Sequence, residues 1–212
     1  MTEAGEWVID LDEALELPGW FLVPDEVGVQ QGWAAELEAS LADLVGAEKW
    51  DGEATTVDDI RDVLAVGIEV RNASTSDLVY QVWPIAGPVA VYCHVNVFAS
   101  ASLPSWSALG AVRYSVDSPH LGTGVQLSTR QTIQEGETAL EYVSVHVVFD
   151  NGEVALVMSL DEAMAPLVSR ALPGFVALMR AVQLQRSDGA PFVAVPPADL
   201  LEDAPWKMED VR

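Results

Sequence analysis

The stretch Tyr142–Leu160, YVSVHVVFDNGEVALVMSL, decides the fold, because it carries two apolar runs of alternating character on either side of Asn151–Gly152. Asn-Gly between two such runs is the strongest short-range signal for a β-hairpin, since a type I′ turn needs positive φ at both central residues. We therefore predict two antiparallel strands joined by a two-residue turn.

The register of this hairpin follows from counting outward from the turn. It pairs Phe149 with Val154 and His146 with Val157, and the apolar side chains at alternate positions fall on one face, the core face. His146 and Ser144 fall on the opposite face, which we call the mixed face because it carries polar and apolar side chains together. Such a division is typical of antiparallel sheets that pack fully on one side only.

The stretch Val89–Phe98, VAVYCHVNVF, alternates in the same way. Cys93 falls on the core face, where burial raises the pKa of a thiol and quiets its chemistry. Tyr92 and His94 fall on the wetter face, so Tyr92, His94 and His146 are candidates for lining a pocket. The third histidine, His120, lies in the stretch DSPHLGTG, where we expect an exposed loop.

Motifs for metal binding and catalysis are weak in this sequence. A site made of His94, His146 and a carboxylate such as Glu141 is conceivable, but the close histidine spacing that marks a metal motif is missing. No G-x-S-x-G turn exposes a serine nucleophile, and Cys93 and His94 point to opposite sides of a strand and cannot form a dyad. LGTGVQ contains a bare G-x-G without the βα context of a phosphate cradle. We predict a non-enzymatic protein without a catalytic, cofactor-binding or metal site.

Seven segments have the alternation and the bounding turn residues of strands. They are GIEVRN (67–72), LVYQVWPI (78–85), VAVYCHVNVF (89–98), LGAVRYSV (109–116), GVQLSTRQTI (124–133), ALEYVSVHVVF (139–149) and EVALVMSL (153–160). We expect IAGPV and QEGET to be tight hairpin links, and SASLPSW and DSPHLGTG to be longer loops. Strands that follow one another without intervening helices predict an antiparallel sheet of about six to seven strands.

Helical patterns lie on either side of these strands. The segment QQGWAAELEASLADLVGAEKW (30–50) has apolar residues at helical spacing and predicts an amphipathic N-terminal helix. Thr56, followed by Asp58 and Asp59, has the pattern of a capped, acidic helix start, and we expect a short helix that ends near Leu64.

The C-terminal segment DEAMAPLVSRALPGFVALMRAV (161–182) is also helical in pattern. Pro166 and Pro173 are expected to start successive helical pieces, because proline is favoured in the first turn of a helix. Apolar side chains on one face of the second piece should pack on the sheet; they are Phe175, Leu178, Met179 and Val182.

These patterns predict a single α+β domain over residues 1–185, followed by a proline-rich acidic tail over 186–212. Within the domain, residues 1–62 form an acidic strand and helix region, and residues 63–185 form the sheet with the C-terminal helix. The tail contains Pro191, Pro196, Pro197 and Pro205, which exclude a sheet interior or a long helix. It either wraps the domain through Phe192 and Trp206 or extends away from it.

The charge of the chain limits its partners. The 212 residues carry a net charge of −23, and residues 1–62 hold 17 of the 33 acidic residues but only two basic ones, Lys49 and Arg61. Binding to a nucleic-acid backbone or an anionic membrane needs clustered Lys and Arg, so both are disfavoured. A protein partner of basic character is compatible with this field, and a solvated surface that only aids solubility is the alternative.

Localisation follows from two further observations. No apolar run approaches the roughly 20 residues needed to span a bilayer, and the acidic stretch MTEAGEWVIDLDEALEL has no basic region of a signal peptide. We therefore expect a cytoplasmic protein without membrane insertion. The single cysteine, Cys93, excludes an intramolecular disulfide and a cysteine-based zinc site.

The chain contains seven tryptophans, four of them in its first quarter. Most should be packing residues, because an indole buries a large area. Exposed ones would form a contact surface for a partner, and Trp7, Trp20, Trp33 and Trp206 are the candidates.

Two stretches resemble proteins of the PsbP-like fold, an αβα sandwich found in photosystem extrinsic subunits and in small actinobacterial lipoproteins. They are ALELPGWFLVPDE and YVSVHVVFDNGEVALVMSLDEAMAPLVSRALPGFVALMRAVQL, about a third of the chain. The resemblance implies an accessory or binding protein without catalytic residues and, by analogy, an association with specialised secretion. The chain lacks the lipobox of the exported members.

A helix-grip domain, in which a curved sheet closes over a long C-terminal helix around an apolar cavity, is the competing fold. We rank it second because Pro173–Gly174 should interrupt the helix. The two functional hypotheses follow from the two folds: an adaptor that binds another protein, or a module that binds an apolar small molecule between sheet and helix. Neither calls for a cofactor.

Overall fold

The computed structural model of the protein describes residues 7–11, 15–45, 49–50, 53–103, 113–136, 138–197 and 200. Along these residues the elements are β1 (Trp7–Leu11), β2 (Trp20–Leu22), α1 (Val27–Val45), β3 (Lys49–Trp50), β4 (Glu53–Ala54), α2 (Val57–Ala73), β5 (Leu78–Val82), β6 (Val91–Ala99), the 3-10 helix η1 (Ser100–Ser102), β7 (Arg113–Ser118), β8 (Gly122–Glu135), β9 (Thr138–Asp150), β10 (Val154–Met164), α3 (Ala165–Ala181) and β11 (Val182–Arg186).

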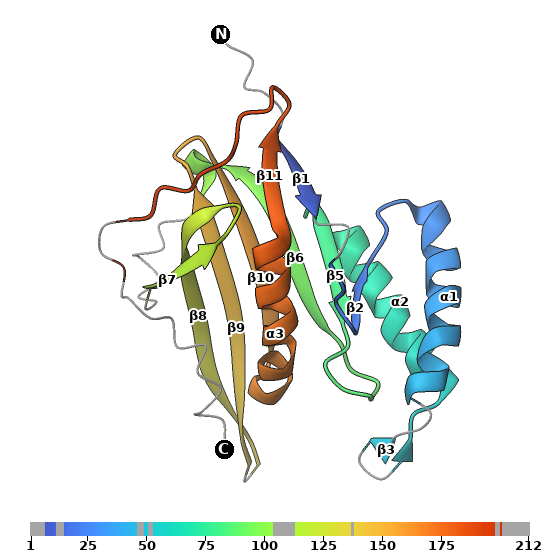
Figure 1. The fold of residues 1–212 in the computed structure, drawn as a ribbon. Coiled ribbons are helices and arrows are strands. Elements are labelled where there is room, and N and C mark those ends of the chain that lie inside the picture. The colour runs from blue at the N-terminus through green and yellow to red at the C-terminus, as the bar shows by residue number, and fades with distance from the viewer. Residues whose placement is uncertain are drawn as a thin grey trace.

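The main sheet has seven strands in the order β2-β5-β6-β10-β9-β8-β7, and each pair of neighbours is antiparallel. Figure 1 shows α3 lying across the strands on one face, with α1 and α2 beside β2 and β5. Strands β1 and β11 form a separate pair at the end of α3, and β3 and β4 form another. The predicted α+β class, with a sheet of six to seven strands packed by N-terminal and C-terminal helices, is confirmed. No helix of the described residues is long and apolar enough to cross a membrane.

The core face of the sheet packs against α3. Phe175 and Leu178 of α3 are fully buried, as are Phe149 and Leu156 on the strands below them. Complete burial of one such side chain stabilises the fold by about 1.5–3 kcal/mol. The four predicted core positions of the C-terminal helical segment, Phe175, Leu178, Met179 and Val182, are all buried, which confirms the predicted packing face.

The C-terminal helix is continuous, and the prediction of two helical pieces is wrong. Pro166 does lie in the first turn, but Pro173 lies inside α3. A proline there removes one hydrogen bond of the helix. Burial outweighs this loss, because residues on both sides of Pro173, among them Val168 and Phe175, pack on the same core. Pro173–Gly174 therefore does not interrupt the C-terminal helix, and an interrupted helix is no argument against the helix-grip fold.

The prediction of a strand at residues 67–72 is also wrong. The capping box at Thr56 is present: its hydroxyl accepts from the backbone N–H of Asp59, and the Asp59 carboxylate accepts from the N–H of Thr56. The helix that starts there continues to Ala73 instead of ending near Leu64. GIEVRN alternates over too few residues to distinguish a strand from a helix whose Gly67 faces the sheet.

The mixed face carries α2 at its β5 edge. Gln81 of β5 points away from the core face and donates its side-chain N–H to the carbonyl of Val63, at 2.6 Å. Gly67 lies over the same amide, which leaves no room for a side chain. Ile60 and Leu64 join Leu41 of α1 in a second apolar cluster, which contains Trp83 as well. The N-terminal helices thus close one half of the mixed face.

The β9–β10 hairpin differs from the predicted one by two residues in register. Asp150 pairs with Ala155 and Phe149 pairs with Leu156, so four residues form the loop. The side chain of Asn151 accepts from the N–H groups of Glu153 and Val154 and holds this wider turn. A register shift of two residues keeps every side chain on its predicted face of the sheet. Only the cross-strand partner of each residue changes.

A β-bulge interrupts β10 close to its end. Leu160 pairs with Val145 and Ala163 pairs with Val143, so two residues of β10, Asp161 and Glu162, lie opposite one residue of β9. A bulge of this kind changes the direction in which side chains leave the strand. Asp161 and Glu162 are both found on the mixed face, where the first contacts His94 and the second contacts Gln131.

Three of the predicted connections can be compared with the structure. QEGET is a tight hairpin link as predicted, with Glu135 paired to Thr138. IAGPV is not tight, because the residues between Val82 and Val91 form an eight-residue connection. DSPHLGTG is not a long loop, since β7 and β8 extend to Ser118 and Gly122 and leave three residues between them. The exposed position expected for His120 is confirmed.

The described residues beyond β11 pack back on the domain. Phe192 is buried, and its ring meets that of Trp7 edge-on at 5.8 Å. The N–H groups of Ala194 and Val195 donate to the carbonyls of Leu121 and Asp150. We call residues 190–197 together with Leu200 the strap. The tail therefore wraps the domain through Phe192, whereas Trp206 lies outside the described residues.

Candidate functional site

The three predicted pocket residues lie together on the mixed face. In the register of the sheet, Ser159 of β10 pairs with His94 of β6 on one side and with His146 of β9 on the other. Tyr92 lies two residues before His94 on the same strand, and its side chain is on the same face. The alternation in the sequence thus placed all three on the right side of the sheet.

His94 joins the end of α2 to the sheet. Its Nδ1 lies 3.0 Å from the hydroxyl of Ser76, and its Nε2 lies 3.2 Å from Oδ2 of Asp161. A carboxylate only accepts hydrogen bonds, so a neutral His94 carries its proton on Nε2 and accepts from the Ser76 hydroxyl at Nδ1. Ser74, the residue that follows α2, donates to the Ser76 hydroxyl in turn.

His146 sits in a row of hydroxyl groups. Its Nδ1 is 2.8 Å from the Ser159 hydroxyl and its Nε2 is 2.9 Å from the Ser144 hydroxyl, which also contacts Thr129 at 2.7 Å. Burial lowers the pKa of His146, and the charge of Asp161 opposes this shift. The imidazole is therefore held neutral by its surroundings, with both ring nitrogens engaged.

A shared metal ion does not fit these residues. Both ring nitrogens of each histidine already contact hydroxyl or carboxylate groups of the protein, and Ser159 lies between the two histidines in the register of the sheet. Glu141, the carboxylate considered with them, is on the strand positions of the opposite face and pairs with Arg130 at 3.2 Å. Among the described residues no group of three metal-ligating side chains converges.

Ser76, His94 and Asp161 form a hydroxyl–imidazole–carboxylate chain, the order of groups found in serine hydrolases. Nucleophilic attack needs a hydroxyl that substrate can reach. Ser76 is buried, with 9% of its surface exposed. Its carbonyl is held by Arg71, and its N–H donates to Ser74. This geometry suits a polar joint between α2 and the sheet.

Tyr92 contacts β5 and lies in the field of carboxylates from α2 and β10. Its hydroxyl lies 3.4 Å from the side-chain nitrogen of Gln81. Burial raises the pKa of Tyr92, and the charges of Asp161 and Glu69 add to the shift. Glu69 belongs to α2 and Asp161 to the β10 bulge, so the charges of carboxylates from two distant parts of the chain act on the same phenol group.

We call Glu69, Tyr92, Asp161 and Glu162 the acidic strip. Glu69 and Glu162 are exposed, and the Asp161 side chain is 46% exposed. Among the described side chains, no Lys or Arg forms an ion pair with any of the three carboxylates. The nearest arginine of α2, Arg71, donates instead to the carbonyl of Ser76. The strip is thus a group of accessible carboxylates on the side of the sheet that carries Tyr92.

No motif in the sequence points directly to this strip. Glu69 lies in the segment predicted as a strand, and a bulge has no fixed sequence pattern. The dipeptide Asp161–Glu162 is the trace that could have been used, because two charged residues in succession break the alternation of β10. Ser76 and Ser159 were not predicted as partners of the histidines.

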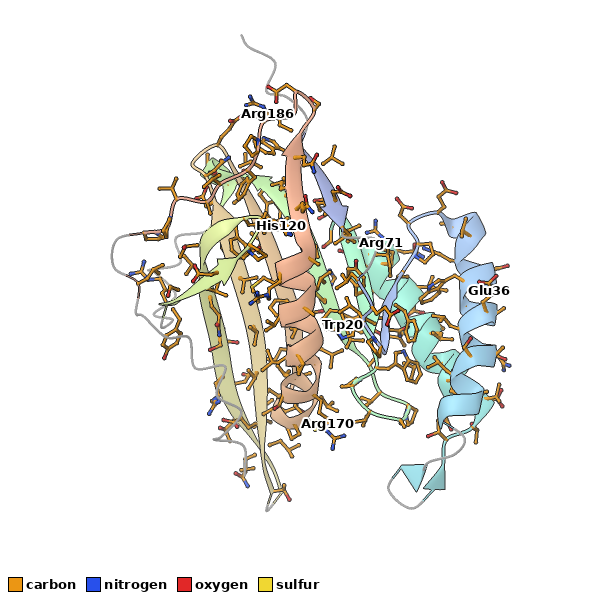
Figure 2. All side chains as sticks on the ribbon, viewed as in Figure 1. Trp20, Glu36, Arg71, His120, Arg170 and Arg186 are labelled. Carbon is orange, nitrogen blue, oxygen red and sulfur yellow. The ribbon has the colours of Figure 1, made fainter. Side chains whose placement is uncertain are left out.

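The predicted contact tryptophans are half-buried in the described part of the chain. Trp7 packs on Phe192 and lies under the guanidinium of Arg186, at 5.7 Å. Trp20, the first residue of β2, lies beside α3 (Figure 2), and its ring would collide with any side chain at Gly174. Trp33 packs on the cluster of α1 and α2. A role of these residues in binding a partner stays a prediction.

Cys93 is fully buried on the core face, and burial raises the pKa of its thiol well above the usual value. Its side chain is therefore on the opposite side of the sheet from His94, as the alternation predicted.

Comparison with known proteins adds no functional assignment. No family model matches the chain, and no curated protein is significantly similar to it.

Proposed function

We propose that this chain is a non-enzymatic accessory protein that binds a basic segment of another protein at the acidic strip. The observation that carries the proposal is the group of carboxylates on the side of the sheet that carries Tyr92. Asp161 and Glu162 leave the β10 bulge on this face, and the charges of Asp161 and Glu69 both raise the pKa of Tyr92. Carboxylates attract Lys and Arg, and the face of an aromatic ring attracts the same cations. The three carboxylates are accessible and lack a Lys or Arg partner among the described side chains, so a cationic segment supplies what they lack.

The state of the two histidines supports a binding role over a catalytic one. A general base needs a ring nitrogen within reach of a substrate. Both nitrogens of His146 are engaged by hydroxyl groups, and those of His94 are engaged by Ser76 and Asp161. The resemblance to PsbP-like proteins, mostly accessory subunits, points in the same direction and is itself a proposal, as is a cytoplasmic location.

The alternative function, a cavity for an apolar ligand between sheet and α3, has less support. Phe175 and Leu178 of α3 and Met158 of β10 fill that space and are fully buried. A ligand would have to displace side chains that already pack at close distance.

The experiment compares two charge-matched variants of the full chain. The strip variant carries Glu69→Gln, Asp161→Asn and Glu162→Gln. The control variant carries Glu16→Gln, Glu26→Gln and Glu36→Gln, which remove three exposed carboxylates from the N-terminal region. Because the whole chain carries a net charge of −23, any cationic peptide binds it weakly, and the control variant measures that background.

Binding of a fluorescent Lys/Arg-rich peptide is followed by anisotropy, and partners are captured from lysate in parallel. We expect the wild-type chain and the control variant to bind alike, and the strip variant to lose at least about tenfold in affinity, the equivalent of about 1.4 kcal/mol. Raising the salt concentration should weaken binding to the first two proteins. Equal affinity of the two variants would contradict the proposal.

A further inference from the structure

The half of the mixed face that α1 and α2 do not cover ends in an apolar patch. It is formed by Val125 and Leu127 of β8, Val148 of β9, and Ala155 and Val157 of β10. All five side chains are buried, although none of the three described helices packs on them. Among the described residues, the apolar side chains packed against this patch are Leu103 and Leu200.

The strap reaches this patch in two parts that are held differently. In its first part, Phe192 and Ala194 are buried, and Phe192 belongs to the main core. In its second part, Val195 is 68% exposed, Pro196 and Pro197 are exposed, and Leu200 is only half-buried. The first part is an anchor, and the second part lies beside the patch with its own side chains largely exposed.

A hollow remains between the second part of the strap and the sheet. The hollow has a volume of about 90 Å³. The strap lines it with Val195, Pro196 and Pro197. The residues opposite include Val125, Val148 and Leu103. Protein interiors leave few voids larger than a water molecule. The contact of the strap with the patch is therefore poorly packed and easy to open.

The patch also offers a hydrogen-bond acceptor to an extended chain. The carbonyl of Asp150 at the end of β9 accepts from the N–H of Val195, at 2.7 Å. If the second part of the strap leaves, that carbonyl needs a new donor, and an incoming extended backbone supplies one. An apolar surface with a main-chain acceptor at its rim suits a peptide better than a compact apolar molecule.

We propose that the patch is a docking surface for an extended apolar segment of a partner protein, and that the strap residues Val195, Pro196, Pro197 and Leu200 occupy it within the same chain until the partner displaces them. This surface is separate from the acidic strip, so the inference goes beyond the function proposed above. The partner segment has the character of the strap, with small apolar residues and proline, and no charged side chain at the positions that meet the patch.

The test uses the full chain and a labelled peptide with the sequence of residues 193–203 as the probe. Leu200→Asp weakens the contact within the chain, and Leu22→Asp is the matched control, since Leu22 is an exposed leucine on the distant strand β2. We expect the peptide to bind the Leu200→Asp variant at least tenfold more tightly than the wild-type chain or the control. Adding Val125→Thr to the Leu200→Asp variant, which makes the patch polar at nearly constant volume, should abolish the gain.

Circular dichroism checks that each variant is folded, and Leu200→Ala replaces Leu200→Asp if the latter is not. Equal binding to the wild-type chain and the variant would overturn the inference, because the strap would then not block the patch. Absence of binding to a folded variant would overturn it as well. A concentration-dependent dimer of the wild-type chain would assign the patch to the strap of a second copy and overturn the partner assignment. None of these outcomes depends on the acidic strip.

Discussion

Gly67 shows how one residue fixes the position of a helix on the sheet. A Cβ added at this position would lie 2.8 Å from the side-chain amide of Gln81, and Gln81 is fully buried and bonded to Val63. The missing side chain therefore lets α2 approach β5 closely enough for that hydrogen bond to form.

Gly67→Ala should destabilise the protein by about 1–3 kcal/mol, because overpacking forces the amide of Gln81 or the helix to move. Gly32→Ala is the control within α1: a Cβ there meets nothing within 4 Å. That substitution should stabilise the protein by up to about 1 kcal/mol, since alanine is the better helix former. Urea unfolding of the two variants measures both changes, and equal signs would contradict the packing of α2 on Gln81.

His146 predicts a pH dependence of stability. Burial lowers the pKa of His146 in the folded chain, whereas the unfolded value is about 6.5. Between these two values the unfolded chain binds a proton that the folded chain does not, so stability increases with pH there. The contribution is complete above about pH 6.5 and is lost as the pH falls toward the folded pKa.

His146→Gln should remove this slope. The difference in unfolding free energy between the wild-type chain and the variant is measured from pH 7.5 to 5, and it should shift in favour of the variant as the pH falls. The many carboxylates titrate in both proteins and cancel in the difference. The control is His120→Gln, which makes the same substitution at a histidine in the exposed turn between β7 and β8 (Figure 2). Parallel curves for the wild-type chain and His146→Gln would mean that the imidazole is not desolvated.

Among the elements, α2 depends on a polar joint at its C-terminal end. Ser76 is buried and gives His94 its closest hydroxyl partner. Ser76→Ala should cost about 1–2 kcal/mol, because a buried ring nitrogen loses its donor. The loss should appear as faster amide exchange in the last turns of α2 and leave α3 unchanged. Ser40→Ala, which removes an exposed hydroxyl of α1, should have no such local effect, and a uniform change across both helices would contradict a local joint.

The alternation of the strands predicted much of this arrangement. Successive side chains of a strand point to opposite faces of the sheet. Cys93, His94 and His146 could therefore be assigned to the correct face without knowing any contact. Registers depend on loop geometry, and Asn151 accepts two backbone N–H groups in a four-residue loop where a two-residue turn was expected. The acidic strip combines Glu69 with a bulge more than ninety residues away. The dipeptide Asp161–Glu162 marks the bulge, but nothing local in the sequence indicates that Glu69 lies on the same side of the sheet.

Helix limits were predicted least well. The end of α2 is set by its packing on Gln81 and by Ser74 and Ser76, all of which are tertiary contacts. In α3, burial on both sides of Pro173 outweighs a strong local signal for a break. Both errors have the same physical cause, because tertiary packing overrides local propensity when a continuous apolar face is available.

For the whole molecule, the net charge of −23 opposes compaction. Arg61 pairs with Glu38 and Asp58, and Arg186 pairs with Asp188, but most carboxylates have no such partner among the described side chains. Raising the salt concentration from about 0.01 M to about 0.1 M shortens the screening length from about 30 Å to about 10 Å. Repulsion between distant carboxylates then weakens, while the apolar core is little affected.

We therefore expect the melting temperature to rise by about 2–4 °C over this range of salt, the equivalent of about 1 kcal/mol for a chain of this size. The control variant of the binding experiment, with Glu16→Gln, Glu26→Gln and Glu36→Gln, should melt higher than the wild-type chain at low salt and gain less from added salt. Differential scanning calorimetry at constant pH measures both effects. A melting temperature that falls with salt would mean that favourable ion pairs, such as those of Arg61 and Arg186, outweigh the repulsion, and the acidic surface would then contribute to stability.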